Sequence, residues 1–447
     1  MISFGNRIEM LVDDYLLAET NNVSFRKAEP KALGKVLGFD EPWEGLGSLG
    51  LTIFEDEENI KCYYRGFPDG ASDQDERQTS CLAVSKDGIR FERAAVNRIS
   101  YDGITENNIV RMDTYCHNFA PFYDTNPACR PGEKYKAIGG KWEEGGVHVF
   151  ASPDGILWHE LADGPVITKG AFDSMNMAFW NPHTGLYHAY TRYFDKTMKS
   201  EVMPMGCRGI QSCTSEDFIH WTEPVYNEYA EGGPTDQLYT NATRPIPGAE
   251  HILVSIPMRF QEKRKKIPEY EGNPYGAGGV SDCVLMTSRD GVYWDRKVKD
   301  AWISGSLYSH EWTQRCFIAL GGIIERGDDF YYYTMQNYMW DDDGIFAYSL
   351  PKYRLISLYA DGNGGSFITK ALRFESDEIY LNYATSAYGY VKVTVLGEDG
   401  AEIFASEEIY GNELSHKLCV EGLCGKCGRL RIELKEAHLY AMGSAMK

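Results

Sequence analysis

A seven-residue turn motif occurs four times along the chain and constrains the fold more than any other feature. It reads Ser, any residue, Asp, Gly or Phe, Ile or Val, any residue, and Phe or Trp. The copies are Ser85–Phe91, Ser152–Trp158, Ser215–Trp221 and Ser288–Trp294. Ser and Asp side chains cap such turns, Gly adopts a positive φ, and the aromatic ring packs where the next strand begins. A repeat of this length predicts a fold assembled from similar units.

Two short apolar or tyrosine-rich segments precede the turn in each unit, and a fifth unit has both segments without the turn. The first segments are Leu49–Phe54, Asn118–Tyr123, Met175–Trp180, Leu238–Thr243 and Cys316–Ile324. The second segments are Lys61–Arg65, Lys134–Gly139, Tyr187–Arg192, His251–Arg259 and Phe330–Gln336. A composition with 30 Tyr, 20 Phe, 9 Trp and 45 Gly fits short strands joined by tight turns.

Five units of about four strands predict an all-β chain whose first part is a five-bladed β-propeller. The strand around Arg7–Leu11 is expected to close the fifth blade, because that unit lacks its own turn motif. Two β-sandwiches in tandem are the alternative for a pattern this rich in strands.

The repeat period ends near Arg354, although alternating strands continue after it. Val391–Val395 and Leu430–Leu434 alternate apolar and polar residues, and Asp399-Gly400 predicts a hairpin turn. We therefore expect two domains, a propeller catalytic domain at residues 1–353 and a small C-terminal β-sandwich domain at 354–447.

The charge of the chain excludes two classes of partner. Its 447 residues include 45 Lys and Arg against 65 Asp and Glu, a formal net charge of −20. Nucleic acids and anionic membranes bind basic faces, so neither is expected as a partner. The first residues do not form a signal peptide, and there is no membrane-spanning apolar run. We expect a cytoplasmic protein with reduced cysteines.

Motifs for cofactors and metals are missing from the sequence. Cys424 and Cys427 form one C-x-x-C pair, but neither a second pair nor a nearby His pair completes a zinc site. Walker loops and dinucleotide fingerprints are also absent. The sequence therefore predicts neither a metal nor a cofactor.

Titratable residues recur at one phase of the repeat, immediately before the first strand of each unit. In a propeller these positions surround one mouth of the central channel, and here they hold Glu44, His117, Asp173, Asp236 and Glu311. The second strands run antiparallel to the first, so their ends return to the same mouth. Those ends include Arg65, Arg192 and Arg259.

Where carboxyl groups are crowded beside arginines, one carboxyl group can stay protonated as a proton donor while another stays charged. Crowding raises the pKa of a carboxyl group, whereas a neighbouring guanidinium favours its charged form. Glycoside cleavage requires such a pair. The predicted catalytic residues are Glu44, Asp173, Asp236 and Glu311. The predicted substrate-binding residues are Trp43, Arg65, His117, Arg192, Gln237, Arg259, Trp312 and Arg315. The structural alternative is that the acids cap turns and the arginines pair with them.

The repeated turn resembles that of the five-bladed propeller glycoside hydrolases, the superfamily of families 32, 43, 62 and 68. The resemblance covers roughly Ile8 to Tyr353, and Ser215–Trp221 is its closest copy. It implies acidic residues at the inner strands of blades 1, 2 and 3, where this chain has Glu44, His117 and Asp173. The W-x-N-D-P-N-G, R-D-P and E-C motifs of family 32 are absent.

The expected function is hydrolysis of a short oligosaccharide or glycoside by carboxylate acid–base chemistry at the propeller mouth. The cationic strand ends allow an anionic group on the sugar. Two alternatives stay open: a glycoside phosphorylase that binds phosphate in the arginine cluster, as in family 130, and a carbohydrate-binding propeller without activity. The sugar, the linkage, the stereochemistry and a homo-oligomeric state are also left open.

Overall fold

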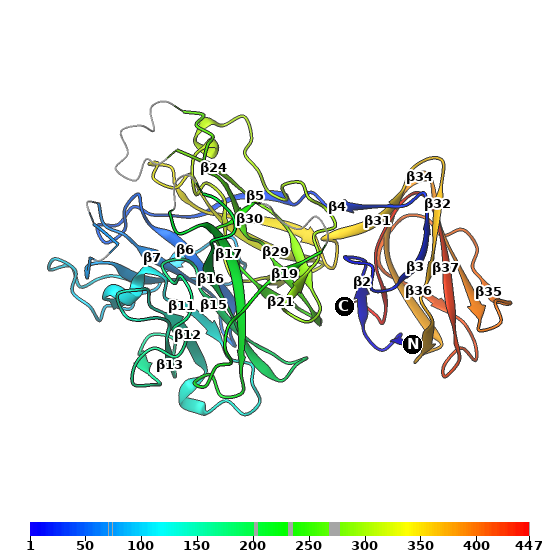
Figure 1. Cartoon of the computed structure of the whole chain (residues 1–447), viewed down its shortest axis with the longest axis horizontal. Coiled ribbons are helices and arrows are strands. Elements are labelled where there is room, and N and C mark those ends of the chain that lie inside the picture. Colours follow the sequence, from blue (N-terminus) through cyan, green and yellow to red (C-terminus); the bar gives the residue numbers. More distant parts are fainter. Residues whose placement is uncertain (70, 74, 201–203, 231–235, 268–277, 447) are drawn as a thin grey trace. The chain divides into compact units, whose positions relative to one another are not determined.

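The repeats of the sequence form successive antiparallel sheets in the computed structural model (Figure 1). The structure describes residues 1–69, 71–73, 75–200, 204–230, 236–267 and 278–446. Within these ranges the helices are short 3₁₀ turns, η1 (Thr114–His117), η2 (Pro131–Glu133) and η4 (Ser309–Trp312). The predicted all-β class is confirmed. In the described residues, no helix is long and apolar enough to cross a membrane.

The chain divides into two compact units. The larger unit comprises Lys31–Arg326 and Tyr331–Ser349. The smaller unit comprises Met1–Pro30, Gly327–Phe330 and Leu350–Lys447. Residues 1–30 therefore belong to the smaller unit, whereas the predicted boundary placed them with the propeller.

The first three sheet groups of the larger unit follow the predicted repeat. Group one contains β6 (Leu49–Glu55), β7 (Ile60–Gly66), β8 (Thr79–Ser85), β9 (Glu92–Arg93) and β10 (Ile109–Met112). Group two contains β11 (Ala120–Tyr123), β12 (Tyr135–Gly139), β13 (His148–Ser152) and β14 (His159–Glu160). Group three contains β15 (Met177–Asn181), β16 (Leu186–Asp195), β17 (Cys207–Ser215) and β18 (Val225–Tyr226).

The fourth group is divided among three small sheets. These contain β20 (Gln237–Leu238), β23 (Met258–Gln261) and β24 (Val280–Cys283); β21 (Arg244–Ile246), β22 (Ala249–Ser255) and β25 (Met286–Ser288); and β19 (Glu228–Tyr229) with β26 (Tyr293–Trp294). Group five contains β27 (Ile318–Ala319), β28 (Ile324–Arg326), β29 (Asp329–Gln336), β30 (Gly344–Pro351) and β5 (Lys31–Gly38). Five blades of a propeller remain our interpretation of this order.

The prediction that the strand around Arg7–Leu11 closes the fifth group is wrong. β2 (Ile8–Met10) pairs with a strand of the smaller unit, Ile8 opposite Gly443. β5 instead pairs with β30, Gly38 opposite Gly344. Burial explains the exchange: all three residues of β2 are buried, as in a strand covered on both faces, whereas β5 is largely exposed, as at a sheet edge.

The four turn motifs share one hydrogen-bond pattern, which confirms the predicted turn. In each copy the Ser Oγ accepts the N–H three residues later, at 2.8–2.9 Å. The Asp Oδ1 accepts two further backbone N–H groups; for Asp154 these belong to Ile156 and Leu157, each at 2.8 Å. The residue at the Gly position has a positive φ, including Phe218 at 70°.

Buried tyrosines connect these turns to neighbouring sheets. The Tyr63 hydroxyl of β7 donates to the Gly155 carbonyl at 2.8 Å. The Tyr333 hydroxyl of β29 donates to the Gly88 carbonyl at 2.9 Å. Because β29 is in the fifth group and Gly88 in the first, this contact joins the ends of the series, as a closed ring requires.

Replacing Asp154 by Ala should lower the free energy of unfolding by about 1 kcal/mol, because two backbone N–H groups lose their acceptor. Asp154→Asn retains an oxygen acceptor and should cost less. Although burial opposes it, hydrogen bonding lowers the pKa of Asp154. Its contribution should therefore be present above the unfolded-state pKa near 4 and lost as the pH falls below it. Urea unfolding at pH 7 and pH 3 measures both effects: D154A should be less stable than wild type at pH 7, and the difference should shrink at pH 3. Equal stability at pH 7, or an undiminished difference at pH 3, would contradict the prediction.

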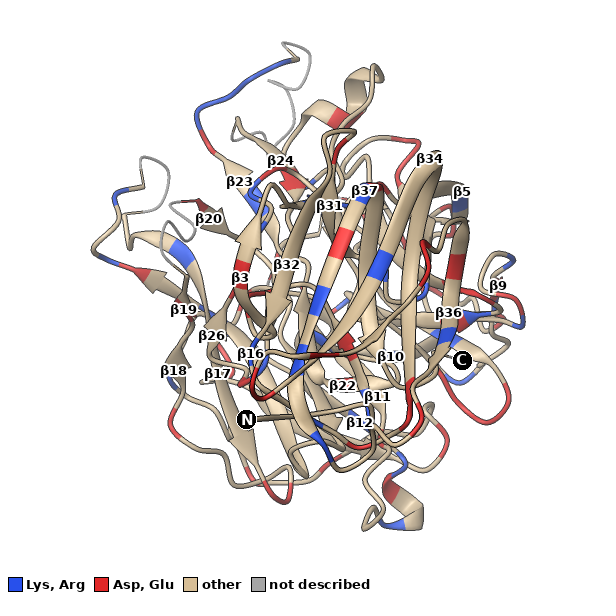
Figure 2. Ribbon diagram, turned by 90° about the vertical axis from the view of Figure 1, so that its right-hand side faces the viewer, with Lys and Arg blue, Asp and Glu red and all other residues tan. Residues whose placement is uncertain are grey.

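The smaller unit is one hydrogen-bonded sheet of 11 strands. Its strands are β1 (Ile2–Phe4), β2, β3 (Leu17–Asn21), β4 (Ser24–Lys27), β31 (Ile356–Ala360), β32 (Gly365–Thr369), β33 (Leu372–Phe374), β34 (Glu378–Gly397), β35 (Glu402–Ala405), β36 (Asn412–Cys419) and β37 (Cys427–Gly443). β34 and β37 lie side by side, and charged residues are spaced along β37 (Figure 2). Leu430, Ile432 and Leu434 alternate with them and are buried in the core. The alternation is as predicted, while the sandwich designation remains an interpretation.

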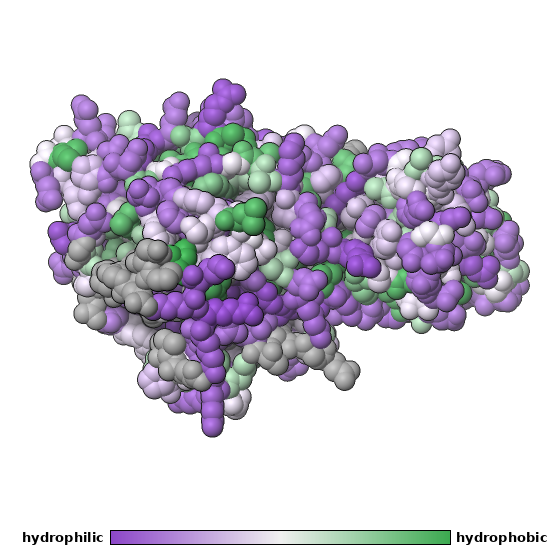
Figure 3. Space-filling view, turned by 90° about the horizontal axis from the view of Figure 1, so that it is seen from above, coloured by the Kyte–Doolittle hydropathy of each residue, from purple (hydrophilic) through white to green (hydrophobic). Residues whose placement is uncertain are grey.

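The surface seen in Figure 3 is mostly hydrophilic, with apolar residues scattered over it. Single exposed apolar side chains such as Leu307 and Tyr388 are common on folded proteins. The surface view therefore directs attention to the interior cavities of the larger unit.

Candidate active site

A cavity of about 90 Å³ in the larger unit is lined by residues from all five sheet groups. Its walls include Leu49 of β6, Asn118 before β11, Met175 before β15, Thr240 after β20 and Ile318 of β27. These positions lie at or next to the inner strands, where the sequence predicts a common mouth. We call this space the central cavity.

Arg65 and His117 form one wall of the central cavity. Arg65 donates from Nη1 to the His117 carbonyl at 3.2 Å and from Nη2 to the Gly47 carbonyl at 2.8 Å. His117 Nδ1 lies 3.0 Å from Gln78 Oε1. Burial, followed by the charges of Arg65 and Lys141, holds the pKa of His117 well below its usual value. The imidazole is therefore neutral at physiological pH.

Asp173 supplies a carboxylate to the central cavity. Its side chain is 40% exposed and forms an ion pair with Arg192, whose own side chain is only 3% exposed. A neighbouring guanidinium favours the charged form of a carboxyl group. Of the four predicted catalytic acids, Asp173 is the one that lines this cavity.

Tyr239, which is not among the predicted site residues, also lines the central cavity. Arg315 Nη2 donates to its hydroxyl at 3.1 Å, and the Arg208 guanidinium carbon lies 4.1 Å from the ring centroid. Arg192 is 5.6 Å from the same centroid. Burial opposes ionisation, but these three cations lower the pKa of Tyr239 to about 7.

A second, larger pocket of about 750 Å³ contains four of the predicted residues: Asp236, Gln237, Arg259 and Trp312. Asp236 pairs with Arg296 at 2.9 Å and lies 3.9 Å from Arg259. Arg208 contacts one residue of each space. Its Nη1 donates to Gln237 Oε1 of the larger pocket at 2.7 Å, and its guanidinium covers the ring of Tyr239 in the central cavity. The predicted residues are therefore divided between two neighbouring spaces.

Glu311 stabilises a loop beside the larger pocket. It lies in η4, and its carboxylate accepts the Ser306 N–H at 2.6 Å. The Trp312 indole donates to the Ser306 carbonyl at 2.7 Å. Trp312 lines the pocket, whereas Glu311 itself lines neither space.

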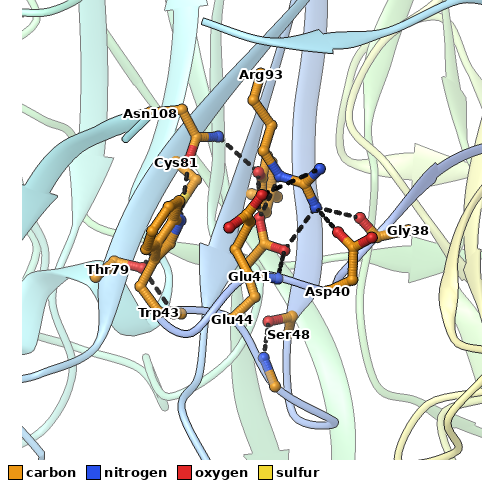
Figure 4. Close-up of polar contacts among 12 residues, drawn as sticks. Gly38, Asp40, Glu41, Trp43, Glu44, Ser48, Thr79, Cys81, Arg93 and Asn108 are labelled. Atoms are coloured by element: carbon orange, nitrogen blue, oxygen red, sulfur yellow. Dashed lines mark hydrogen bonds and ion pairs between the residues drawn. The ribbon is translucent and has the colours of Figure 1, made fainter. Parts of the chain in front are cut away.

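Glu44 and Trp43, which the sequence predicts as site residues, are buried and line neither of the two cavities. Figure 4 shows the polar contacts that they make instead. The Glu44 carboxylate is fully buried; it accepts the Tyr64 hydroxyl at 2.6 Å and pairs with Arg93 at 2.8 Å. The Trp43 indole donates to Asn108 Oδ1 at 3.0 Å. Glu44 therefore anchors the loop before β6, and Trp43 offers no stacking face.

Two further groups of acids lie outside the cavities. Burial raises the pKa of Asp343 to about 9; Lys35 opposes this shift, and Asp342 and Glu44 add to it. Among the described residues, His310, Asp341 and Asp342 place ligand atoms within 4.8 Å of one another, a set that could hold a metal ion. His310 Nδ1 already contacts Asp342 at 3.0 Å. The expectation of a metal-free protein remains a prediction.

Comparison with known proteins gives no match to a protein family or to a curated protein. Solved structures with a similar arrangement include a glycoside hydrolase at 13% identity (TM-score 0.46, 72% of this chain and 92% of that chain). A β-1,2-mannobiose phosphorylase from Listeria innocua is 11% identical (TM-score 0.46, 74% and 97%). An N-acetylgalactosamine deacetylase from F. plautii is 12% identical (TM-score 0.43, 91% and 95%).

Proposed function

We propose that the larger unit is a carbohydrate-active enzyme that hydrolyses a glycosidic bond at the central cavity. One observation carries the proposal: the carboxylate of Asp173 and the phenol of Tyr239 line the same cavity, and each of them contacts an arginine. Glycoside cleavage needs a charged group on one side of the anomeric carbon and a proton donor on the other. Asp173 is the proposed charged group, and Asp236 in the neighbouring pocket is the second candidate carboxylate.

The cations of the central cavity support a substrate with an anionic group. Arg65 and Arg315 line the cavity, and among the described residues neither forms an ion pair with a carboxylate. Arginine binds carboxylate and phosphate groups through paired N–H donors. A sugar acid is therefore the proposed substrate class. Arginine binds inorganic phosphate in the same way as a carboxylate. The two arginines therefore also favour a glycoside phosphorylase, which is the second candidate function.

A panel of 4-nitrophenyl glycosides and glycuronides, assayed with and without inorganic phosphate, tests the proposal. We expect nitrophenol release without phosphate, with kcat/KM roughly tenfold higher for a glycuronide than for its neutral parent, because the arginines bind its carboxylate. Turnover that depends strictly on phosphate would identify a phosphorylase. Absence of turnover on every member, with and without phosphate, would contradict an enzymatic role for this cavity. The Asp173→Asn variant serves as the blank.

A further inference from the structure

Tyr239 is held by contacts at both its backbone and its side chain. Its N–H donates to the Met258 carbonyl of β23 at 2.8 Å, and its carbonyl accepts the Ser174 hydroxyl at 2.9 Å. Ser174 follows Asp173 directly in the sequence and also lines the central cavity. The Ser174 hydroxyl therefore links the segment that carries the carboxylate to the segment that carries the phenol.

The cations around Tyr239 direct their charge at its hydroxyl. Within the described part of the chain, no carboxylate is paired with Arg208 or Arg315, whereas Arg192 is paired with Asp173. Arg315 binds the Tyr239 oxygen directly, and Arg208 covers the ring. A phenolate formed at this position gains stabilisation from these groups that a neutral phenol does not.

We propose that Tyr239 is the catalytic proton donor of this site, delivering its phenolic proton to the glycosidic oxygen while Asp173 acts on the attacking water. The inference rests on the proposed function and names the acid that the reaction requires. A tyrosine with a pKa near 7 is protonated in about half of the molecules at neutral pH and releases its proton readily, and efficient acid catalysis needs such a pKa.

Each bond that breaks in the proposed reaction is matched by a bond that forms. The O–H bond of Tyr239 breaks and its proton bonds to the glycosidic oxygen, which leaves with the electron pair of the anomeric C–O bond. A water oxygen bonds to the anomeric carbon, and the proton lost by that water passes to the Asp173 carboxylate. The products are an alcohol, a free sugar, a phenolate and a carboxylic acid. Proton exchange with solvent then restores both side chains.

The surrounding charges favour proton donation over covalent attack by Tyr239. The arginines stabilise the phenolate, which is the product of proton donation but the reactant of nucleophilic attack. An aryl glycoside formed by attack would be neutral and would lose that stabilisation. His117 is neutral, so it holds no second ring proton that would be readily released at pH 7.

The test compares leaving groups in the Tyr239→Phe variant, which keeps the ring and removes the proton. With a methyl glycoside, whose leaving oxygen needs protonation, kcat should fall about 10²–10⁴-fold. With a 2,4-dinitrophenyl glycoside of the same sugar, which leaves without protonation, kcat should fall less than about tenfold. Tyr226→Phe, which removes the hydroxyl of a half-exposed tyrosine on β18, should match wild type on both. An equal loss on both substrates, or no loss on either, would overturn the proposal.

Titration separates failure of this inference from failure of the proposed function. Near-ultraviolet absorbance should show one tyrosinate forming with a midpoint near pH 7 in wild type and not in Y239F. In the active enzyme, kcat/KM should decline above the same pH, because the donor has then lost its proton. A midpoint near 10, or a rate that rises through pH 7, would contradict the donor role even if glycosides are cleaved. A midpoint near 7 without turnover on any glycoside would instead contradict the proposed function.

Discussion

Replacing Asp173 by Asn is expected to lower kcat by about 10³-fold or more while leaving the fold intact. The amide occupies the same volume but neither accepts a proton from water nor carries the charge that Arg192 faces. Asp173 is partly exposed, but Arg192 is buried and loses its carboxylate partner, so the free energy of unfolding should also fall, without loss of the folded state. Steady-state kinetics on a cleaved glycoside, together with urea unfolding, measures both quantities.

Asp236→Asn is the companion variant, since Asp236 lies in the neighbouring pocket beside Arg259 and Arg296. A loss of turnover in both variants would indicate that the two carboxylates act together. A loss in D173N alone would confine the chemistry to the central cavity. Full activity in both variants would contradict the assignment of the site.

Replacing Glu44 by Gln should lower the free energy of unfolding by about 2–4 kcal/mol, because it removes the charge of a fully buried carboxylate and leaves Arg93 with its more exposed partners. Urea unfolding measures the loss. The matched control is Glu41→Gln; Glu41 is more exposed and lies 4.0 Å from Arg93, so its loss should stay within about 0.5 kcal/mol.

The same variant separates a structural from a catalytic role for Glu44. The folded fraction of E44Q should keep wild-type kcat, because no side-chain atom of Glu44 reaches either cavity. Unchanged stability combined with a large loss of kcat would restore Glu44 to the catalytic set.

Local features of this chain could be predicted from its sequence. The Ser–Asp turns form from contacts within three residues, so the motif alone specifies them. The repeat phase also predicted that residues preceding the first strands meet around one mouth, and two of them, His117 and Asp173, line the central cavity. Both inferences use only spacing along the chain.

Side-chain direction at the site depends on partners distant in sequence and could not be predicted. Glu44 and Asp173 hold equivalent positions in the repeat, yet Arg93 draws Glu44 into the interior while Arg192 holds Asp173 at the cavity. Tyr239 carried no local signal, because its chemistry arises from Arg208 and Arg315 on other elements. Strand β5 likewise replaced the predicted closing strand through a pairing across some 300 residues.

The pairing of β1–β4 with the strands after Leu350 has a consequence for protein synthesis. Residues 1–30 are translated before their partners in β31–β33 and β37, which follow roughly 330–435 residues later. At about 5–20 residues per second, these strand edges wait roughly 17–87 s during synthesis before they can pair. The first three sheet groups join neighbouring segments and can form as they emerge, whereas β5 of the fifth group must also wait for its partner β30. The strands of residues 1–30 therefore cannot complete their sheet until the segments after Leu350 are made, and unpaired strand edges of this kind favour aggregation.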